Sequence, residues 1–189
     1  FLNKYIRKPI KLLQRRLVVR RAKALLTVSE TSKKDIARLY HKKLDDITVV
    51  PNAWQHITRF SNDDRILDKY NLKEKSYIFT LGSRVPHKNI QWIITNALKN
   101  KDELFVVSGE NSYDTNFEHK IFPSNIIFTG YITDEEIKSL MSHCKAFVLP
   151  SLYEGFGIPP LEALALGCKI IVSNISCLPE IYGDTAYYV

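Results

Sequence analysis

The chain has 189 residues, of which 45% are hydrophobic and 25% are charged, and its formal net charge at pH 7 is +7. This composition predicts a packed globular protein and excludes an intrinsically disordered one. No apolar run approaches the roughly 20 residues that a helix needs to cross a bilayer, so a membrane-spanning helix is excluded too. Because the sequence begins at Phe1 and not at methionine, we expect a fragment whose upstream part could have held a targeting segment.

The positive charge is concentrated at the start of the chain, where all the charged residues before Glu30 are lysines and arginines. Leu13 and Leu17 are among the apolar residues that recur there at helical spacing, which predicts a basic amphipathic helix. Two interpretations stay open. Residues 4–23 contact an anionic membrane surface, or the helix packs on its own domain with a solvated basic face. Nucleic acid is not expected, because no aromatic-basic reading motif accompanies the charge.

The first part of the chain has the pattern of a small α/β unit. Apolar runs at 24–28 and 47–50 predict strands, and residues 33–40 between them predict a helix that Ser29 or Ser32 could cap. Residues 52–75 are polar and aromatic without a strand signal, so we interpret them as a connection. We therefore expect residues 1–75 to be one partial domain with its connection, and residues 76–189 to be a second, incomplete domain.

The second part alternates short β-branched runs with helical patterns, which is typical of parallel βαβ units. We expect an α/β fold in which a Rossmann-like, doubly wound parallel sheet accompanies the smaller unit. The weak pattern at 113–122 should supply a crossover, and residues 186–189 could begin a further strand. The predicted strands are 77–81, 104–108, 126–129, 146–149 and 169–173, and the predicted helices are 88–98, 134–143 and 161–166.

Three cysteines, Cys144, Cys168 and Cys177, lie beside apolar segments without C-x-x-C spacing. An odd number without such spacing predicts small, buried core residues in a reducing compartment.

The loop after the first strand of the second domain reads Gly-Ser-Arg-Val-Pro-His-Lys-Asn, from Gly82 to Asn89. Both cations of this loop suit phosphate oxygens. Arg84 can donate two parallel hydrogen bonds from its guanidinium group, and Lys88 can supply a compact positive charge. Asn89 is expected to cap the next helix, and His87 to be only a neighbour in the loop. In a doubly wound sheet, ligands bind outside the carboxyl ends of the strands, so this loop should open onto the same crevice as the loop at 150–160.

That second loop joins two carboxylates, Glu154 and Glu162, to a glycine segment and to a helix start marked by Pro159 and Pro160. Two cations and two carboxylates in one crevice suit a ligand with phosphates and several hydroxyls, such as a nucleotide sugar. The plain structural alternative is an exposed loop glutamate and a glutamate that a helix N-terminus favours. A glycosidase acid and nucleophile pair is a further alternative.

The run from Glu154 to Glu162, with its continuation to Gly167, resembles the E-x7-E signature of the retaining GT-B glycosyltransferases of family 4, also called group 1. The Gly82–Asn89 loop is similar to the diphosphate loop of this family. The resemblance extends over about residues 24–189, and shorter matches in the same order are Thr27–Glu30, Val50–Asn52, Phe128–Tyr131 and Leu178–Glu180.

The resemblance implies a role for each matching residue. Arg84 and Lys88, with Gly82 and Ser83, would hold the diphosphate, and Glu162 would bind the ribose. Catalytic roles fall to Glu154, Arg84 and Lys88. The donor sugar would face Glu154, Gly155, Phe156 and Gly157, and the nucleobase would lie near Tyr131 and Ile132. The chain departs from the family at Gly109-Glu110-Asn111, where many members have G-x-G, and a phosphate contact there is not expected.

We therefore expect a retaining hexosyltransferase that uses a nucleotide diphosphate sugar and a glycan or lipid-linked acceptor in cell-surface polysaccharide synthesis. We expect the enzyme to be cytoplasmic, and to lie at the inner face of the membrane if the basic helix binds lipid. No metal or cofactor is expected, because the chain has no Asp-x-Asp motif. Since the resemblance implies that most of an N-terminal domain is missing, a non-catalytic nucleotide-sugar-binding module stays an alternative. A nicotinamide-dependent dehydrogenase is disfavoured, because the first strand does not lead into G-x-G-x-x-G.

Overall fold

The computed structural model describes residues 2–82, 85–109 and 122–189, with side chains from residue 11 onward. The chain divides into two compact units, Phe1–Asn52 and Ala53–Val189.

The first unit is two short parallel strands joined by a helix. It begins with the helix α1 (Leu2–Arg21), followed by β1 (Leu25–Thr27), α2 (Glu30–Tyr40), a 3-10 turn (Leu44–Asp46) and β2 (Ile47–Val49). Ser29 caps α2, because its hydroxyl accepts a hydrogen bond from the Ser32 amide at 3.1 Å. This cap explains why the helix begins before residue 33. In the described part of the chain, no helix is both long and apolar enough to span a membrane.

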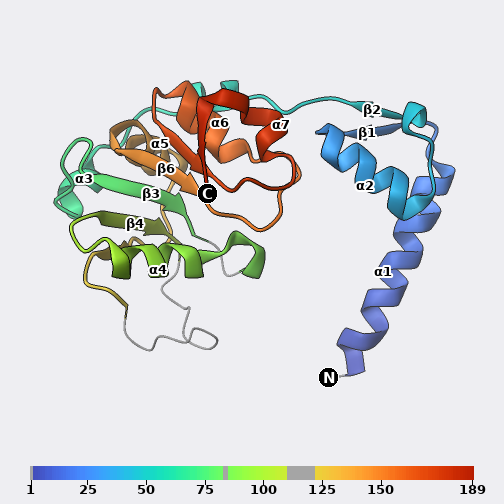
Figure 1. Ribbon diagram of the computed structural model, residues 1–189, viewed down its shortest axis with the longest axis horizontal. Coiled ribbons are helices and arrows are strands. Elements are labelled where there is room, and N and C mark those ends of the chain that lie inside the picture. The colour runs from blue at the N-terminus through green and yellow to red at the C-terminus, as the bar shows by residue number, and fades with distance from the viewer. Residues whose placement is uncertain (1, 83–84, 110–121) are drawn as a thin grey trace. The chain divides into compact units, whose positions relative to one another are not determined.

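The second unit contains a six-stranded, all-parallel sheet, which confirms the predicted doubly wound fold (Figure 1). In spatial order the strands are β5-β4-β3-β6-β7-β8. The chain thus builds outward from β3 in one direction and from β6 in the other, which makes the β3–β6 boundary the switch point of the topology. The strands are β3 (Tyr77–Leu81), β4 (Leu104–Ser108), β5 (Ile126–Phe128), β6 (Ala146–Leu149), β7 (Ile170–Val172) and β8 (Ala186–Tyr188).

Helices cover both faces of this sheet. The helix α4 packs on one face, and α3, α5, α6 and α7 contribute to the core on the other (Figure 1). The helices are α3 (Arg65–Lys69), α4 (Ile90–Lys99), α5 (Asp134–His143), α6 (Ile158–Ala165) and α7 (Leu178–Tyr182), with 3-10 turns η2 (Gln55–Arg59), η3 (Pro86–Lys88) and η4 (Gly183–Thr185).

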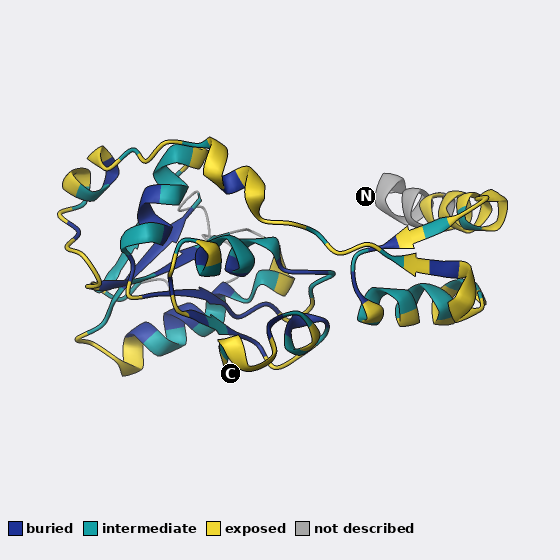
Figure 2. Ribbon diagram, turned by 90° about the horizontal axis from the view of Figure 1, so that it is seen from above, coloured by how far each residue is buried: buried dark blue, intermediate teal, exposed yellow. Residues whose placement is uncertain are grey.

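The central strands are buried on both faces (Figure 2). Along β4, Val106 joins one core cluster while its neighbours Phe105 and Val107 join the other. On β6, Val148 likewise lies on the opposite side from Phe147. This alternation follows from the period of two in a strand, and burial on both faces explains why these strands read as continuous apolar runs.

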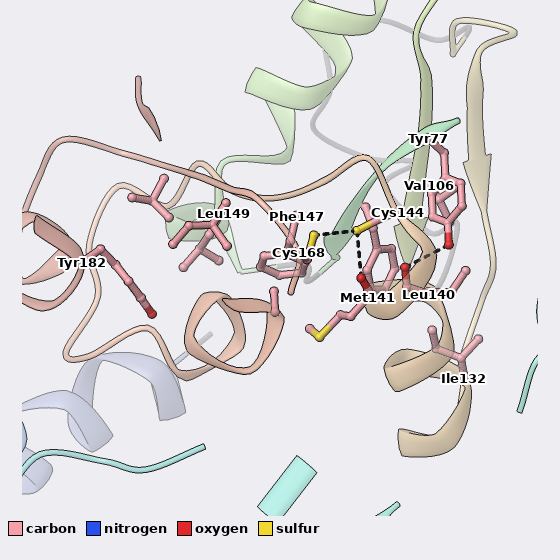
Figure 3. Packing of buried hydrophobic residues seen from close by; sticks show 14 of the residues in the cluster. Tyr77, Val106, Ile132, Leu140, Met141, Cys144, Phe147, Leu149, Cys168 and Tyr182 are labelled. Carbon is pink, nitrogen blue, oxygen red and sulfur yellow. Dashed lines mark hydrogen bonds between the residues drawn. The ribbon is translucent and has the colours of Figure 1, made fainter. Parts of the chain in front are cut away.

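The larger core cluster lies between β3, β6 and α5 (Figure 3). The Tyr77 hydroxyl donates to the Leu140 carbonyl oxygen at 2.9 Å, so this buried polar atom is satisfied. Cys144 and Cys168 face each other in this cluster with their sulfur atoms 3.1 Å apart. All three cysteines are free and buried, as predicted. Burial raises the pKa of the Cys177 thiol to about 11.

Residues 53–75, which we expected to be a connection, lie in the second unit by their contacts. They carry η2 and α3, and Ile57, Ile66 and Leu72 are buried. Their weak periodicity hides them from a pattern search, because each turn buries only one or two side chains. The expected crossover at 113–122 falls outside the described residues except for Phe122, whose ring packs edge-on against Phe128.

Candidate donor-binding site at the switch point of the sheet

The two loops that sequence analysis singled out follow adjacent strands. Gly82 follows β3 and Pro150 follows β6, and these strands pair in parallel at the switch point. Carboxyl ends of parallel strands meet at one edge of a sheet, and in open α/β sheets this is where ligands bind. The structure therefore brings the two predicted loops together.

Direct contacts between described residues join the two loops. The Leu152 amide donates to the His87 carbonyl oxygen at 2.7 Å, and the Asn89 side-chain amide donates to the Pro150 carbonyl oxygen at 3.0 Å. The Lys88 ammonium nitrogen lies 2.7 Å from a carboxylate oxygen of Glu154. The side chains of Lys88 and Glu154 are 25% and 13% exposed, so the pair is shielded but still reachable by a ligand.

Asn89 differs from its predicted role. It stands at the N-cap position of α4, but its side chain makes no capping hydrogen bond. Its backbone is left-handed, with φ of 53°, which ends η3 and starts α4. This conformation frees the side-chain amide to hold Pro150 in place. Asn89 therefore links the loops and does not cap the helix through its side chain.

Residues just before α7 and within it hold the glutamate loop, which runs from Pro150 to Gly157, in place. The Ser176 hydroxyl donates to the Glu154 carbonyl oxygen at 2.6 Å, and the Cys177 thiol lies 3.2 Å from the same oxygen. The Tyr182 hydroxyl donates to the Gly157 carbonyl oxygen. Burial raises the pKa of Tyr182, so this donor keeps its proton at neutral pH. Both ends of the glycine segment are thereby fixed.

Gly157 is required by its conformation and its surroundings. Its φ is +85°, and a Cβ atom there would lie 2.7 Å from the Leu178 Cδ2 atom. The next residues begin α6, with Pro159 and Pro160 in its first turn. Because proline has no N–H group, this helix start offers fewer backbone donors than most helix N-termini.

Glu162 lies on α6 and is contacted by a residue that sequence analysis missed. His56 of η2 places its Nε2 atom against the Oε1 atom of Glu162, and the Glu162 side chain is only 12% exposed. His56 is 106 positions away in the sequence and lies in the segment that we interpreted as a connection. No local pattern could have revealed the contact.

The residues expected near a nucleobase separate into one exposed and one buried side chain. Tyr131 is 89% exposed, whereas Ile132 is buried in the large core cluster. Just after the end of β4, Gly109 forms an isolated β-bridge with Gly130, in which the Gly109 amide donates to the Gly130 carbonyl oxygen at 2.7 Å. Of Tyr131 and Ile132, only Tyr131 has a side chain that a ligand can reach, because Ile132 is buried in the core.

The remaining predicted residues are of two kinds. Phe156 is buried, so a ligand would meet the backbone of the segment around it. Ser83 and Arg84 lie outside the described residues, as do Glu110 and Asn111. Within the described ranges, no group of three or more His, Cys, Asp or Glu side chains could hold a metal ion.

Comparison with known proteins identifies the family of the chain. The family model "Glycosyl transferases group 1" matches residues 62–187. The O-antigen chain mannosyltransferase RfbU of Salmonella typhimurium is 33% identical over 180 residues, which are 92% of this chain and 48% of that protein. The O-antigen chain mannosyltransferase B of Escherichia coli is 31% identical over 176 residues, covering 86% of this chain and 46% of that protein. The chain thus spans about half the length of these relatives.

A solved structure has the same fold. Sucrose-phosphate synthase from Thermosynechococcus elongatus superposes with a TM-score of 0.77 at 18% sequence identity, covering 96% of this chain and 48% of that one. The matched family range contains Lys88, Glu154 and Glu162. The structure pairs Lys88 with Glu154 beside the switch point of the sheet, and it places Glu162 on α6, the helix that follows the Glu154 loop. By this match the chain belongs to the glycosyl transferases group 1 family.

Proposed function

We propose that this chain is the donor-binding part of a retaining glycosyltransferase of cell-surface polysaccharide synthesis. The enzyme would transfer a hexose from a nucleotide diphosphate sugar to a glycan or lipid-linked acceptor. The observation that carries the proposal is the Lys88–Glu154 pair at the carboxyl edge of β3 and β6, with Glu162 on α6, the helix that follows the Glu154 loop. One cation for a diphosphate and two carboxylates for vicinal hydroxyls match the chemistry of such a donor.

In this proposal each side chain has one role. Lys88, with Arg84, binds the diphosphate and stabilises the negative charge that grows on it as the sugar leaves. Glu154 accepts hydrogen bonds from sugar hydroxyls, and Glu162 accepts them from the ribose. The exposed ring of Tyr131 lies beside the nucleobase. Donor binding proceeds without a metal ion, since the cations meet the charge of the phosphates.

The retaining outcome is inferred from the family. The bond between the sugar C1 atom and the diphosphate oxygen breaks, and the acceptor oxygen bonds to C1 on the same face. The departing phosphate takes the proton of the acceptor hydroxyl. Because both reported relatives are named mannosyltransferases, we propose mannose as the hexose.

A nucleotide panel tests the donor assignment. Calorimetric titration of the 189-residue chain in metal-free buffer with UDP-, GDP- and ADP-linked sugars should give one preferred nucleotide. Among sugars on that nucleotide, the mannose derivative should bind best. A flat response to the whole panel would contradict the donor-site assignment, and a preference for another hexose would contradict only the choice of mannose.

We also propose that α1 contacts anionic lipid at the cytoplasmic face of a membrane. In the described part of this helix, Leu13 and Leu17 are exposed and line a groove together with Arg16, Arg20 and the α2 residue Leu39. Apolar side chains between arginines suit an interface of acyl chains and negative headgroups.

Vesicle sedimentation tests this contact. The chain should bind vesicles that contain phosphatidylglycerol and not vesicles of phosphatidylcholine alone, and the double charge reversal Arg16→Glu, Arg20→Glu should abolish binding. Binding should weaken as salt rises, because the charges are exposed. Equal binding to both kinds of vesicle, or none to either, would refute the proposal.

A further inference from the structure

The carboxylate of Glu162 is engaged on one side only. His56 contacts its Oε1 atom, and within the described part of the chain Oε2 makes no hydrogen bond. The Glu162 side chain is 12% exposed, while that of His56 is 44% exposed. One carboxylate oxygen is therefore held by the protein, and the other is left for a ligand.

His56 sits on an anchored turn and not on a loose connection. The next residue, Ile57, is 3% exposed, and its amide donates to the Trp54 carbonyl oxygen at 3.0 Å. The Thr58 hydroxyl donates to the Gln55 carbonyl oxygen at 2.7 Å. At the far end of the turn, the Lys138 ammonium of α5 donates to the Phe60 carbonyl oxygen at 2.7 Å. The imidazole is thus presented to Glu162 from a fixed backbone.

We propose that His56 is a positioning residue, which orients the Glu162 carboxylate so that Oε2 meets the ribose hydroxyls of the donor. The inference rests on the proposed donor site. A glutamate side chain has several rotatable bonds, and freezing them when a ligand binds costs entropy. A hydrogen bond to one oxygen fixes the carboxylate plane beforehand, as outer-shell partners do for metal ligands.

The test compares ribose with a sugar that lacks its hydroxyls. We would titrate the 189-residue chain with UDP, GDP and ADP and with their 2′,3′-dideoxy analogues in metal-free buffer. For whichever nucleotide binds, His56→Ala should weaken binding about 3- to 10-fold, the range for one net hydrogen bond. Binding of the dideoxy analogue should not change, because its sugar has no 2′ or 3′ hydroxyl to donate a hydrogen bond to Glu162.

Two further variants separate positioning from a general structural effect. His56→Gln keeps a side-chain N–H donor and should recover part of the preference for ribose. Gln55→Ala removes an exposed side chain from the same turn and should leave both affinities as they are. An equal loss for the ribonucleotide and its dideoxy analogue would overturn the inference. Tighter ribonucleotide binding by His56→Ala would also overturn it, because His56 would then compete with the ribose.

The variant Glu162→Ala distinguishes failure of the positioning role of His56 from failure of the donor site. It should remove the preference for ribose over the dideoxy sugar. If the preference survives in Glu162→Ala, the ribose role of Glu162 is wrong, and the inference about His56 is wrong with it. If Glu162→Ala removes the preference and His56→Ala does not, the donor site stands and only the positioning role is refuted.

Discussion

Lys88→Ala is expected to weaken the binding of a nucleoside diphosphate about 10- to 100-fold and to leave the free nucleoside unaffected. A hydrogen bond to a charged group contributes about 1.5–3 kcal/mol, and about 1.4 kcal/mol corresponds to a tenfold change in affinity. Lys88 stands beside the switch point and is held there by Glu154 at 2.7 Å. Metal-free calorimetry with the nucleoside and its diphosphate measures the difference.

Lys99→Ala is the matched control, since it removes an exposed lysine from the far end of the helix that follows Lys88. It should change neither affinity. Lys88→Arg keeps the charge but not the point-like ammonium, so its affinity should fall between those of the wild type and of Lys88→Ala. Equal losses for nucleoside and diphosphate in Lys88→Ala would mean that the lysine only supports Glu154, and would refute its phosphate role.

Gly157→Ala is expected to lower the free energy of unfolding of the second unit by about 2–5 kcal/mol. The positive φ of +85° costs roughly 1–2 kcal/mol with any side chain. The new methyl group would lie 2.7 Å from Leu178 Cδ2, and relieving such overpacking costs about 1–3 kcal/mol more. The shift should also disturb the Tyr182 hydrogen bond to Gly157 and weaken donor binding.

Gly167→Ala separates the two costs. Gly167 has a similar φ of +78°, but a Cβ atom there would have no atom within 4 Å outside its own neighbours. This variant should lose only the backbone contribution and should bind donor normally. Urea unfolding of both variants measures the difference between their free energies of unfolding. A decrease of the same size in both variants would contradict the packing argument at Gly157.

Most of the fold follows from short-range patterns. The expected bounds of β3, β4, β6 and α5 are those of the structure. The strands were readable because they are buried on both faces and so appear as unbroken apolar runs. The helix α5 has a clear start, since Thr133 and Glu136 form a capping box. The helix α6 begins earlier than its apolar pattern, because Pro159 and Pro160 fit its first turn.

The candidate site was predictable only in part. Lys88 and Glu154 could be assigned to one crevice, because loops after adjacent parallel strands must meet. Their direct pairing depends on the turn η3, which ends at Asn89 with a left-handed backbone, and the motif match gives no information on this turn. His56 was missed because its partner Glu162 is far away in the sequence. The burial of Ile132 follows from tertiary packing, which a motif match does not report.

We propose that Lys88, Glu154 and Glu162 together bind a nucleotide diphosphate sugar. The titration of the unmodified 189-residue chain in metal-free buffer tests it most directly, when the preferred nucleotide sugar is compared with its nucleoside. We expect one site, at which the nucleotide sugar binds at least about tenfold more tightly than the nucleoside, as one charge-assisted contact to phosphate requires. Equal affinities for the two ligands, or no binding of either, would contradict it.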